Sequence, residues 1–375
     1  MLEPRGGPIR RALSPRAGPE THPHRTDAIV PRFSLEQARE LVARHYGLDA
    51  TARELPSYVD QNFHVLDASG AEYVLKIYNS DEDPSFVDAQ IAALRHIAGQ
   101  ISVLATPRII PCLDGAPATR AGEHEVCLGS YLPGQPLADL PHPSPGLLRD
   151  LGRGLGELDE RLASFTHPAL RRQFRWDLRQ APRALEFVGH IEDAAGRVAV
   201  RERLVQFKSE VLPIVDRLPF QSIHNDANDH NVLVLELGEA RQGLVDFGDM
   251  VWTARVCEPS IAMAYAMSRA ENPLQAGAEL LAGYHESLAL GVAEIRVIPH
   301  LIAARLCVSV TMSAYQRGRD PDNAYLAVSE APAWRLLDWM SRTPRALWIE
   351  TFEEACESVR PIEGNSTPER AADEA

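Results

Sequence analysis

The chain has 375 residues, 45% of them hydrophobic and 24% charged, which is typical of a globular protein large enough for two lobes. Its formal net charge of −14 argues against a nucleic-acid partner, because a phosphate backbone requires a basic surface. No uninterrupted apolar run reaches the roughly 18 residues of a membrane span. The five cysteines are scattered and include no C-x-x-C pair, which predicts buried free thiols in a cytoplasmic protein.

The two ends of the chain differ from its middle. Residues 1–31 contain six prolines and no apolar periodicity, which predicts a disordered leader, and residues 361–375 predict a disordered tail. Between them we expect an α+β protein of two lobes, with a small β-rich lobe over residues 32–132 and a larger, mostly helical lobe over residues 133–360.

The first lobe contains two predicted helices and three strand-like runs. SLEQARELVARHYGL has Ser34 as an N-cap and apolar residues at helical spacing, so it predicts a helix. QNFHVLDASGAEYVLKIYN predicts two strands joined by a turn at residues 67–70. A second helix is expected between Asp83 and Gly99, and HEVCLGSYLPGQPL predicts a strand that ends at its Pro-Gly pair.

The second lobe reads as helices with one exception. LLRDLGRGLGELDERLASF is strongly amphipathic, and residues 181–218 and 257–340 contain several more helical patterns. The exception is a pair of strand-like runs, IHNDANDHNVLV at residues 223–234 and GLVDFGDMVW at residues 243–252. The first of these places two histidines, two aspartates and three asparagines immediately before an apolar strand.

These polar residues have the spacing of a phosphoryl-transfer site. His224, Asp226 and Asn231 form H-x-D-x-x-x-x-N, in which the aspartate acts as base and the asparagine binds Mg²⁺. Fifteen residues later, Asp246 begins a D-F-G and is the expected second magnesium ligand. The third component is Lys76, one of only two lysines among 38 basic residues, which lies in an apolar strand as the phosphate-binding lysine of kinases does.

Other interpretations of the same residues remain open. Each motif alone could be a solvated turn or an edge-strand cation, whereas their joint order and spacing favour phosphoryl transfer. A metal-dependent hydrolase using the histidines and aspartates of residues 224–230 is a rival. A nucleotide-binding regulator without catalysis is another rival. Proteins that have lost kinase activity usually lack one of the residues that correspond to Lys76, Asp226 and Asp246, whereas this chain has all three.

Beyond these motifs, the chain resembles the aminoglycoside phosphotransferase and choline kinase superfamily of small-molecule kinases, which have a protein-kinase-like fold. Within it the sequence is most similar to the hydroxylysine kinases and their bacterial relatives, from about Leu35 to Met340. The segments that carry this likeness are LPSYVDQNFHV, FTHPALRRQFRWDLRQAP, NDANDHNVLV with VDFGDM, and ARLCVSVTMSAYQRGRDPDNAYLAVSEAPAW.

The resemblance implies transfer of the γ-phosphate of GTP or ATP, with Mg²⁺, to the hydroxyl of 5-hydroxylysine. Carried over to this sequence, Asp226 is the base that orients the hydroxyl, Asn231 and Asp246 hold magnesium, and Lys76 contacts the phosphates. Tyr131, in GSYLPG, is implied to lie in the hinge whose backbone meets the nucleobase.

Three positions depart from the superfamily pattern. Asn225 occupies the glycine slot of H-G-D, so its backbone is expected to tolerate a side chain.

Gln90 stands where a glutamate would pair with Lys76, and we expect it to hold the lysine by a hydrogen bond, with Asp88 and Glu82 less well placed. The loop SYVDQNF lacks the kinase glycines, so the polar side chains expected over the phosphates are Asp60, Gln61 and Asn62.

An amino-acid acceptor needs acidic or aromatic groups for its cations and a basic group for its carboxylate. The candidates for the cations are Asp249, Glu258, Trp176, Asp177 and Tyr265, and the candidate for the carboxylate is Arg305. Each could instead be a core aromatic, a helix cap or a structural ion pair. A kinase of another amino alcohol, such as homoserine, choline, ethanolamine or an aminoglycoside, therefore remains an alternative.

Overall fold

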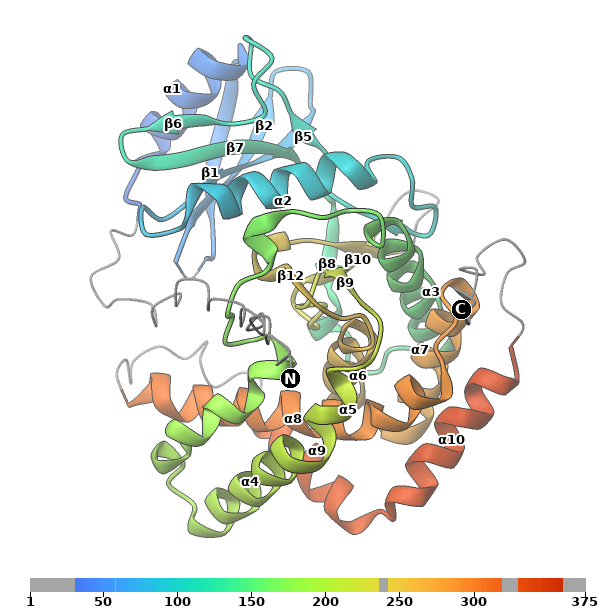
Figure 1. The fold of residues 1–375 in the computed structure, drawn as a ribbon. Coiled ribbons are helices and arrows are strands. Elements are labelled where there is room, and N and C mark those ends of the chain that lie inside the picture. The colour runs from blue at the N-terminus through green and yellow to red at the C-terminus, as the bar shows by residue number, and fades with distance from the viewer. Residues whose placement is uncertain (1–30, 58, 236–241, 319–329, 360–375) are drawn as a thin grey trace, which may run out of the picture.

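The structure, a computed structural model, describes residues 31–57, 59–235, 242–318 and 330–359. The predicted tail and all but residue 31 of the predicted leader lie outside the described residues. Figure 1 shows a sheet-containing lobe above a larger helical lobe, with helix α2 (Pro84–Ile97) between them.

The first lobe is built on a six-stranded antiparallel sheet with the order β1-β2-β3-β7-β5, in which β6 also pairs with β7. Its elements are α1 (Leu35–Tyr46), β1 (Ala50–Leu55), β2 (Gln61–Asp67), β3 (Glu72–Ile77), α2 (Pro84–Ile97), β5 (Ile109–Ile110), β6 (Thr119–Ala121) and β7 (His124–Ser130).

Local sequence signals explain most of these elements. Ser34 caps α1 in a capping box, as predicted, and Asp83 caps α2. Leu75 and Ile77 are fully buried in the lobe's core, so Lys76 between them projects from the opposite face of β3. Strand β1 was not predicted, because at this edge of the sheet the chain carries only weak apolar alternation.

Helix α2 packs against both lobes. Val87 and Ile91 lie in a cluster with Tyr78 and Cys127 of the first lobe, whereas another face of the helix, including Ala93, belongs to the core of the second lobe. The short strand β4 (Leu104–Ala105) that follows α2 does not join the first sheet, since it pairs with β11 (Gln242–Leu244) of the second lobe. Both lobes therefore share the segment around α2.

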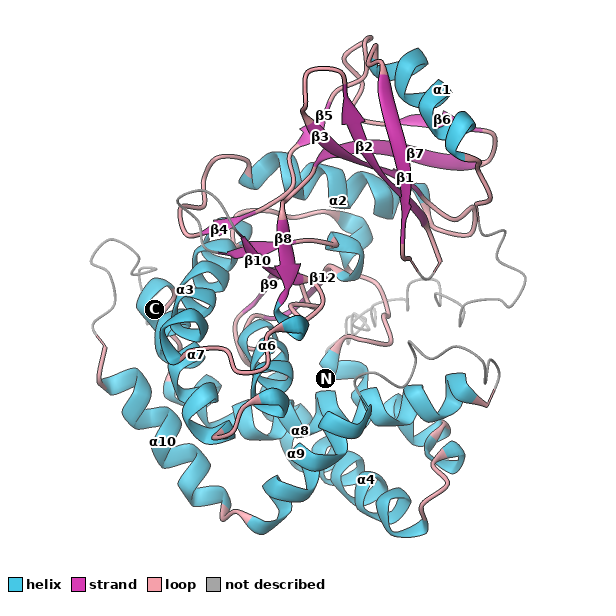
Figure 2. Ribbon diagram, turned by 180° about the vertical axis from the view of Figure 1, so that it is seen from behind, coloured by secondary structure: helices cyan, strands magenta, loops and turns pink. Residues whose placement is uncertain are grey.

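The second lobe contains two small sheets and a helical body. One sheet has the order β4-β11-β10-β8 and the other pairs β12 with β9; Figure 2 shows them beneath α2. Its strands are β8 (Gly134–Pro136), β9 (Phe220–Ile223), β10 (Val232–Leu235), β11 (Gln242–Leu244) and β12 (Val251–Ala254). Its α-helices are α3 (Pro145–Leu162), α4 (Ala194–Gln206), α5 (Leu212–Val215), α6 (Cys257–Arg269), α7 (Pro273–Ser287), α8 (Val292–Arg317), α9 (Glu330–Arg342) and α10 (Arg345–Glu357). Short 3₁₀ helices cover Leu137–Asp139, Pro168–Leu170, Leu178–Glu186, Val188–His190 and Phe247–Asp249, and a π-helical turn covers Phe207–Val211.

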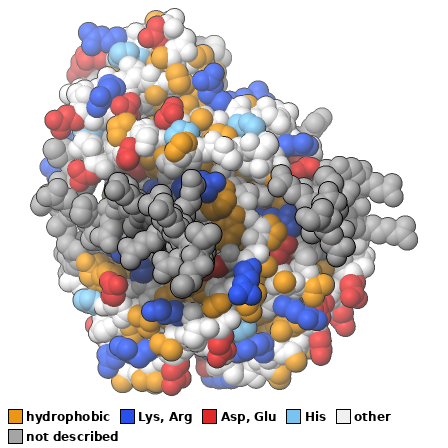
Figure 3. Space-filling view, viewed as in Figure 1, with side chains coloured by type: hydrophobic (Ala, Val, Ile, Leu, Met, Phe, Trp, Pro, Cys, Tyr) orange, Lys and Arg blue, Asp and Glu red, His pale blue; other side chains and the backbone are white. Residues whose placement is uncertain are grey.

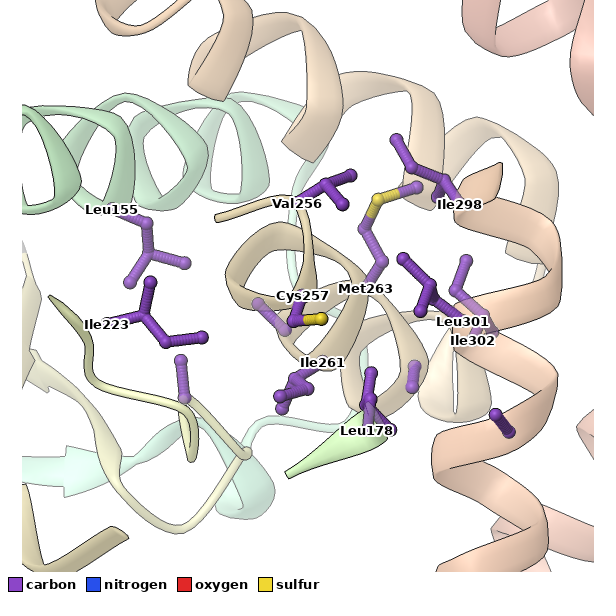
Figure 4. Close-up of a cluster of buried hydrophobic side chains, with 14 of the residues drawn as sticks. Leu155, Leu178, Ile223, Val256, Cys257, Ile261, Met263, Ile298, Leu301 and Ile302 are labelled. Carbon is purple, nitrogen blue, oxygen red and sulfur yellow. The ribbon is translucent and has the colours of Figure 1, made fainter. Parts of the chain in front are cut away.

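Helix α6 lies at the centre of the second lobe. Figure 4 shows Cys257 and Ile261 of this helix between Leu155 of α3 and Leu301 of α8. Helix α8 is long and apolar enough, by length and composition, to cross a membrane, although Arg296 and Arg305 interrupt its apolar sequence, and 89% of its apolar window is buried inside the protein. Over the described part of the face in Figure 3, acidic and basic side chains are interspersed.

Helices α3 and α7 are in close contact through glycines. A Cβ added at Gly283 would lie 1.9 Å from the backbone oxygen of Arg149, and one added at Gly152 would lie 1.9 Å from that of Leu280. The two backbones therefore approach to a distance that excludes any side chain at these positions.

We expect Gly283→Ala to lower the free energy of unfolding by about 1–3 kcal/mol or more, since the new methyl group forces the two helices apart. Gly146→Ala, also in α3, is the matched control: no atom lies within 4 Å of its added Cβ, so alanine is expected to be neutral or slightly stabilising. Urea midpoints of both variants measure the difference. Equal midpoints would contradict the close helix contact.

Candidate functional site

The polar segment predicted to carry the chemistry forms the loop between β9 and β10. Strand β9 pairs with β12 and strand β10 pairs with β11, so the loop over residues 224–231 lies beside the turn over residues 245–250. Hydrogen bonds join them: among these, the backbone N–H of Val245 donates to the carbonyl of Asn231 at 3.0 Å, and the imidazole Nε2 of His224 lies 3.2 Å from the carbonyl of Val245.

Asp226 is held by three side-chain donors. The guanidinium of Arg305 donates to its Oδ1 at 2.5 Å, and the amides of Asn228 and Asn231 each donate to its Oδ2 at 2.8 Å. The carboxylate retains 18% exposure, whereas the Arg305 side chain is only 2% exposed. Burial and the neighbouring Asp249 raise the pKa of Asp226 to about 8, although Arg305 opposes this shift.

His224 has a structural part in this loop. It is fully buried against the ring of Phe247, and burial lowers its pKa to about 4, so the imidazole is neutral. Its Nδ1 accepts from the backbone N–H of Asp226 at 3.2 Å, which leaves Nε2–H to donate to Val245. With both nitrogens engaged, and with Asp229 paired to Arg269, this segment is poorly suited to the zinc site of the hydrolase alternative.

The glycine slot of the loop is occupied by an asparagine in a glycine-like conformation. Asn225 has φ +68°, a region that asparagine tolerates better than most residues with a side chain. Its N–H donates to Oε2 of Glu258 at 2.7 Å, and its side-chain amide donates to the carbonyl of Asp249 at 3.1 Å. Glu258 is fully buried in this role, which corrects the expectation that it contacts the acceptor.

The two predicted magnesium ligands are Asn231, at the end of the loop over residues 224–231, and Asp246, near the start of the turn over residues 245–250. The Nδ2 of Asn231 donates to Asp226, so its Oδ1 has no hydrogen-bond donor among the residues that the structure describes. Asp246, in a left-handed conformation at φ +60°, accepts from the N–H of Gly248, and the charge of Lys76 holds its pKa below the usual range. An amide oxygen and a carboxylate are ligands that Mg²⁺ prefers, so the donor set fits this metal.

Lys76 lies between two carboxylates. Its Nζ is 3.2 Å from Asp246 and 3.2 Å from Asp60. Burial alone would lower the pKa of Lys76, but Asp246 and Asp60 raise it well above the ordinary value. Gln90 does not hold the lysine, contrary to the prediction: it is 4% exposed on the apolar side of α2, and its Oε1 accepts from the hydroxyl of Tyr78 at 3.4 Å.

Asn62 and Gln61, which were both expected over the phosphates, lie on opposite faces of β2 because successive side chains of a strand alternate. Asn62 pairs directly with Lys76 across β2 and β3, so the two side chains share the cleft face. Gln61 projects to the other face, where it bonds the backbone of Phe33 and the carboxylate of Glu54, which corrects its predicted contact with phosphates.

Tyr131 lies where the chain passes from the first sheet to the second. It follows β7 directly, its N–H donates to the carbonyl of Glu72 at 3.1 Å, and its ring packs edge-on against His64 with 4.6 Å between centroids. This is the position of the predicted hinge between the lobes.

The acceptor candidates fall into two groups. Trp176 and Tyr265 surround the Arg305 guanidinium, with ring centroids 4.8 and 5.4 Å from it. Asp249 lies beside Asp226, and burial together with Asp246 raises its pKa to about 6. Asp177 is 2% exposed, caps the 3₁₀ helix at Leu178–Glu186 and accepts from Thr253, so it belongs to the core and not to an acceptor pocket.

One further arginine lies at the site, and the sequence motifs did not identify it. The guanidinium of Arg172 lies 3.3 Å from the ring centroid of Phe86 in α2 and donates to the carbonyl of Gly248 at 3.1 Å. Burial lowers its pKa to about 10 against the opposing effect of Asp249. Arg172 thus connects α2 to the turn that carries Asp246. The aromatic residues around it in RRQFRW were the available signal.

Comparison with known proteins relates this geometry to a family. A model of the phosphotransferase enzyme family matches residues 51–296. Hydroxylysine kinase of Mus musculus is 30% identical over 360 residues, covering 86% of this chain and 94% of that protein. Hydroxylysine kinase of Bos taurus is 31% identical over 353 residues, with the same shares of both chains covered.

Solved structures show the same fold at low identity. An amicoumacin kinase in complex with AMP-PNP, Ca²⁺ and Ami has a TM-score of 0.60 and 14% identity, covering 78% of this chain and 89% of that chain. A choline/ethanolamine kinase family protein of Mesorhizobium loti has a TM-score of 0.55 and 16% identity, covering 86% and 99%. The predicted two-lobed, kinase-like α+β fold is thereby confirmed.

Proposed function

Since this chain belongs to the phosphotransferase enzyme family, and is a small-molecule kinase with an alcohol group as acceptor, we propose that it phosphorylates the hydroxyl of 5-hydroxylysine. The observation that carries this proposal is the likeness to proteins named hydroxylysine kinase across 86% of the chain. The phosphate donor is a nucleotide, and we propose GTP or ATP, with Mg²⁺ as the metal.

The contacts of Asp226 support its proposed role as the group that orients the hydroxyl. An ionised carboxylate has about four lone-pair sites, and Arg305, Asn228 and Asn231 use three of them. The remaining site, together with the residual exposure of the side chain, leaves room for one further donor, the acceptor's O–H. Asp226 in its ionised form then takes the hydroxyl proton as the acceptor oxygen bonds the γ-phosphorus, while the bond from that phosphorus to the β–γ bridging oxygen breaks and the nucleoside diphosphate leaves.

Asn231 and Asp246 are the proposed metal ligands, and Lys76 is the proposed contact of the phosphates. Bound Mg²⁺ would neutralise charge on the transferred phosphoryl group. Lys76 adds a positive charge on the first-lobe side of the cleft, and Asn231 links the metal site to the base, because its amide donates to Asp226.

For the acceptor's ammonium groups we propose Asp249. Its carboxylate accepts no hydrogen bond from any residue that the structure describes, and it lies in the field of Asp226 and Asp246, where a cation would be stabilised. The guanidinium of Arg305 already bonds Asp226, Tyr265 and the carbonyl of Trp176. We therefore propose that Arg305 acts through Asp226 and not on the acceptor's carboxylate.

A transfer assay with Mg²⁺, ATP and GTP side by side, over 5-hydroxylysine, homoserine, choline, ethanolamine and kanamycin, tests this function. We expect turnover of hydroxylysine, and we expect Asp249→Asn to raise the KM of the acceptor by about 10- to 100-fold while the KM of the nucleotide changes little, because a lost charge-assisted bond costs about 1.5–3 kcal/mol. Turnover of another acceptor alone would replace the substrate. Nucleotide binding without any transfer would favour the regulator.

The proposal includes a cytoplasmic location. All five cysteines are buried free thiols, as is usual for proteins of a reducing compartment.

A further inference from the structure

The lysine of the site has an acidic partner that does not come from helix α2. Gln90 of α2 bonds Tyr78, and Asp88 of the same helix lies 3.4 Å from His167 of the second lobe. The carboxylate of the first lobe that reaches Lys76 is Asp60, at 3.2 Å. Asp60 lies in the short segment between β1 and β2.

Asp60 is itself held in place by several bonds. Its Oδ1 accepts from both the backbone N–H and the side-chain amide of Asn79, at 3.0 and 3.2 Å, so its Oδ2 is turned toward Lys76. The hydroxyl of Ser57 also donates to the backbone carbonyl of Asp60. Asn79 follows β3, so the carboxylate links the β1–β2 turn to the end of the strand that carries the lysine.

This placement differs from the expectation that Asp60 lies over the phosphates. A carboxylate beside a triphosphate would meet repulsion between like charges, whereas beside Lys76 it is 15% exposed and paired with a cation. Asp246, the other partner of Lys76, is a proposed metal ligand. When metal and nucleotide engage Asp246, Asp60 is the carboxylate that remains to orient the lysine.

We propose that Asp60 is the positioning residue for Lys76, so that the turn between β1 and β2, and not helix α2, sets the lysine against the nucleotide phosphates. This inference rests on the proposed function of Lys76 as a phosphate contact. It assigns to Asp60 a role that acts through the lysine, without direct contact with the nucleotide.

A double-mutant cycle tests the inference, using wild type, Asp60→Asn, Lys76→Met and the double variant. We expect Asp60→Asn to raise the nucleotide KM and Kd by about 10-fold, with a smaller change in the acceptor KM, because contacting charged residues commonly couple by such factors. In the Lys76→Met background the same substitution is expected to change either constant by less than about 3-fold. Asp88→Asn is the matched control on α2 and is expected to leave both constants unchanged.

Equal losses from Asp60→Asn in the two backgrounds would overturn the inference, since they would mean that Asp60 only maintains the turn through Asn79. An increase of similar size from Asp88→Asn would also overturn it, in favour of the helix. Thermal midpoints of the four proteins separate loss of fold from loss of binding. Nucleotide Kd needs no acceptor, so a wrong acceptor would leave this test intact, whereas an unchanged Kd in Lys76→Met would reject the proposed phosphate contact itself.

Discussion

Asp226→Asn is expected to lower kcat by about 10²- to 10⁴-fold, the range typical of a lost general base. Asparagine keeps the size of the side chain and an oxygen that can accept from Arg305, but it cannot take up the hydroxyl proton. Because Asp226 is proposed to act in the chemical step and not in nucleotide binding, the Kd of the nucleotide is expected to remain within a few-fold of wild type. Single-turnover kinetics with hydroxylysine, and nucleotide titration without it, measure the two quantities.

The controls for Asp226 follow from its buried partner. Asp226→Ala would leave Arg305 buried without its anion, which is expected to lower the free energy of unfolding by up to about 3–5 kcal/mol. A loss of activity in that variant could therefore reflect unfolding, which is why asparagine is the decisive change. Asp216→Asn, which removes an exposed pair with Arg179, is the matched neutral control. Wild-type turnover by Asp226→Asn would rule out the proposed base.

Asp246→Asn is expected to lower turnover by at least about 100-fold and to raise the Mg²⁺ concentration needed for half-maximal activity. Even changes in the groups that support a metal ligand typically cost about 10- to 100-fold, and here a charged ligand is lost. The substitution also removes one of the two carboxylates beside Lys76, so nucleotide affinity is expected to fall as well.

A magnesium titration at saturating nucleotide distinguishes a metal defect from a general loss of fold. Partial recovery of turnover at high Mg²⁺, with an unchanged thermal midpoint, is the expected pattern. If Asp246→Asn retained the magnesium dependence of wild type, Asp246 would not be a metal ligand, and the assignment of Asn231 as its companion would lose its basis.

Many elements of the fold follow from local sequence. The capping box at Ser34, the cap at Asp83 and the alternation around Lys76 each predicted an element that the structure contains. The spacing of Asp226 and Asn231 likewise reflects a short loop whose two ends bond each other, as their hydrogen bonds show. These signals are readable because capping and strand alternation act within a few residues along the chain.

The partners of the site's charges required the tertiary structure. Gln90 and Asp60 lie on different elements, and only the packing of α2 turns the first toward Tyr78 and leaves the second beside Lys76. Glu258 and Asn225 are 33 residues apart, yet they form one buried contact that holds a left-handed backbone.

The sequence by itself thus determined the family, the two-lobed plan and which residues are proposed as base, metal ligands and phosphate-contacting lysine, because those residues occur at characteristic short spacings or in characteristic strands. It could not decide which carboxylate pairs with the lysine, which one supports the loop over residues 224–231, and which one has no hydrogen-bond donor among the described residues and is therefore proposed to bind the acceptor. Asp60, Glu258 and Asp249 are chemically similar side chains whose surroundings differ. Packing pairs Asp60 with Lys76, buries Glu258 against the backbone N–H of Asn225, and leaves the carboxylate of Asp249 without a hydrogen-bond donor among the described residues. Burial and pairing depend on contacts between segments far apart in the chain, which local periodicity does not encode.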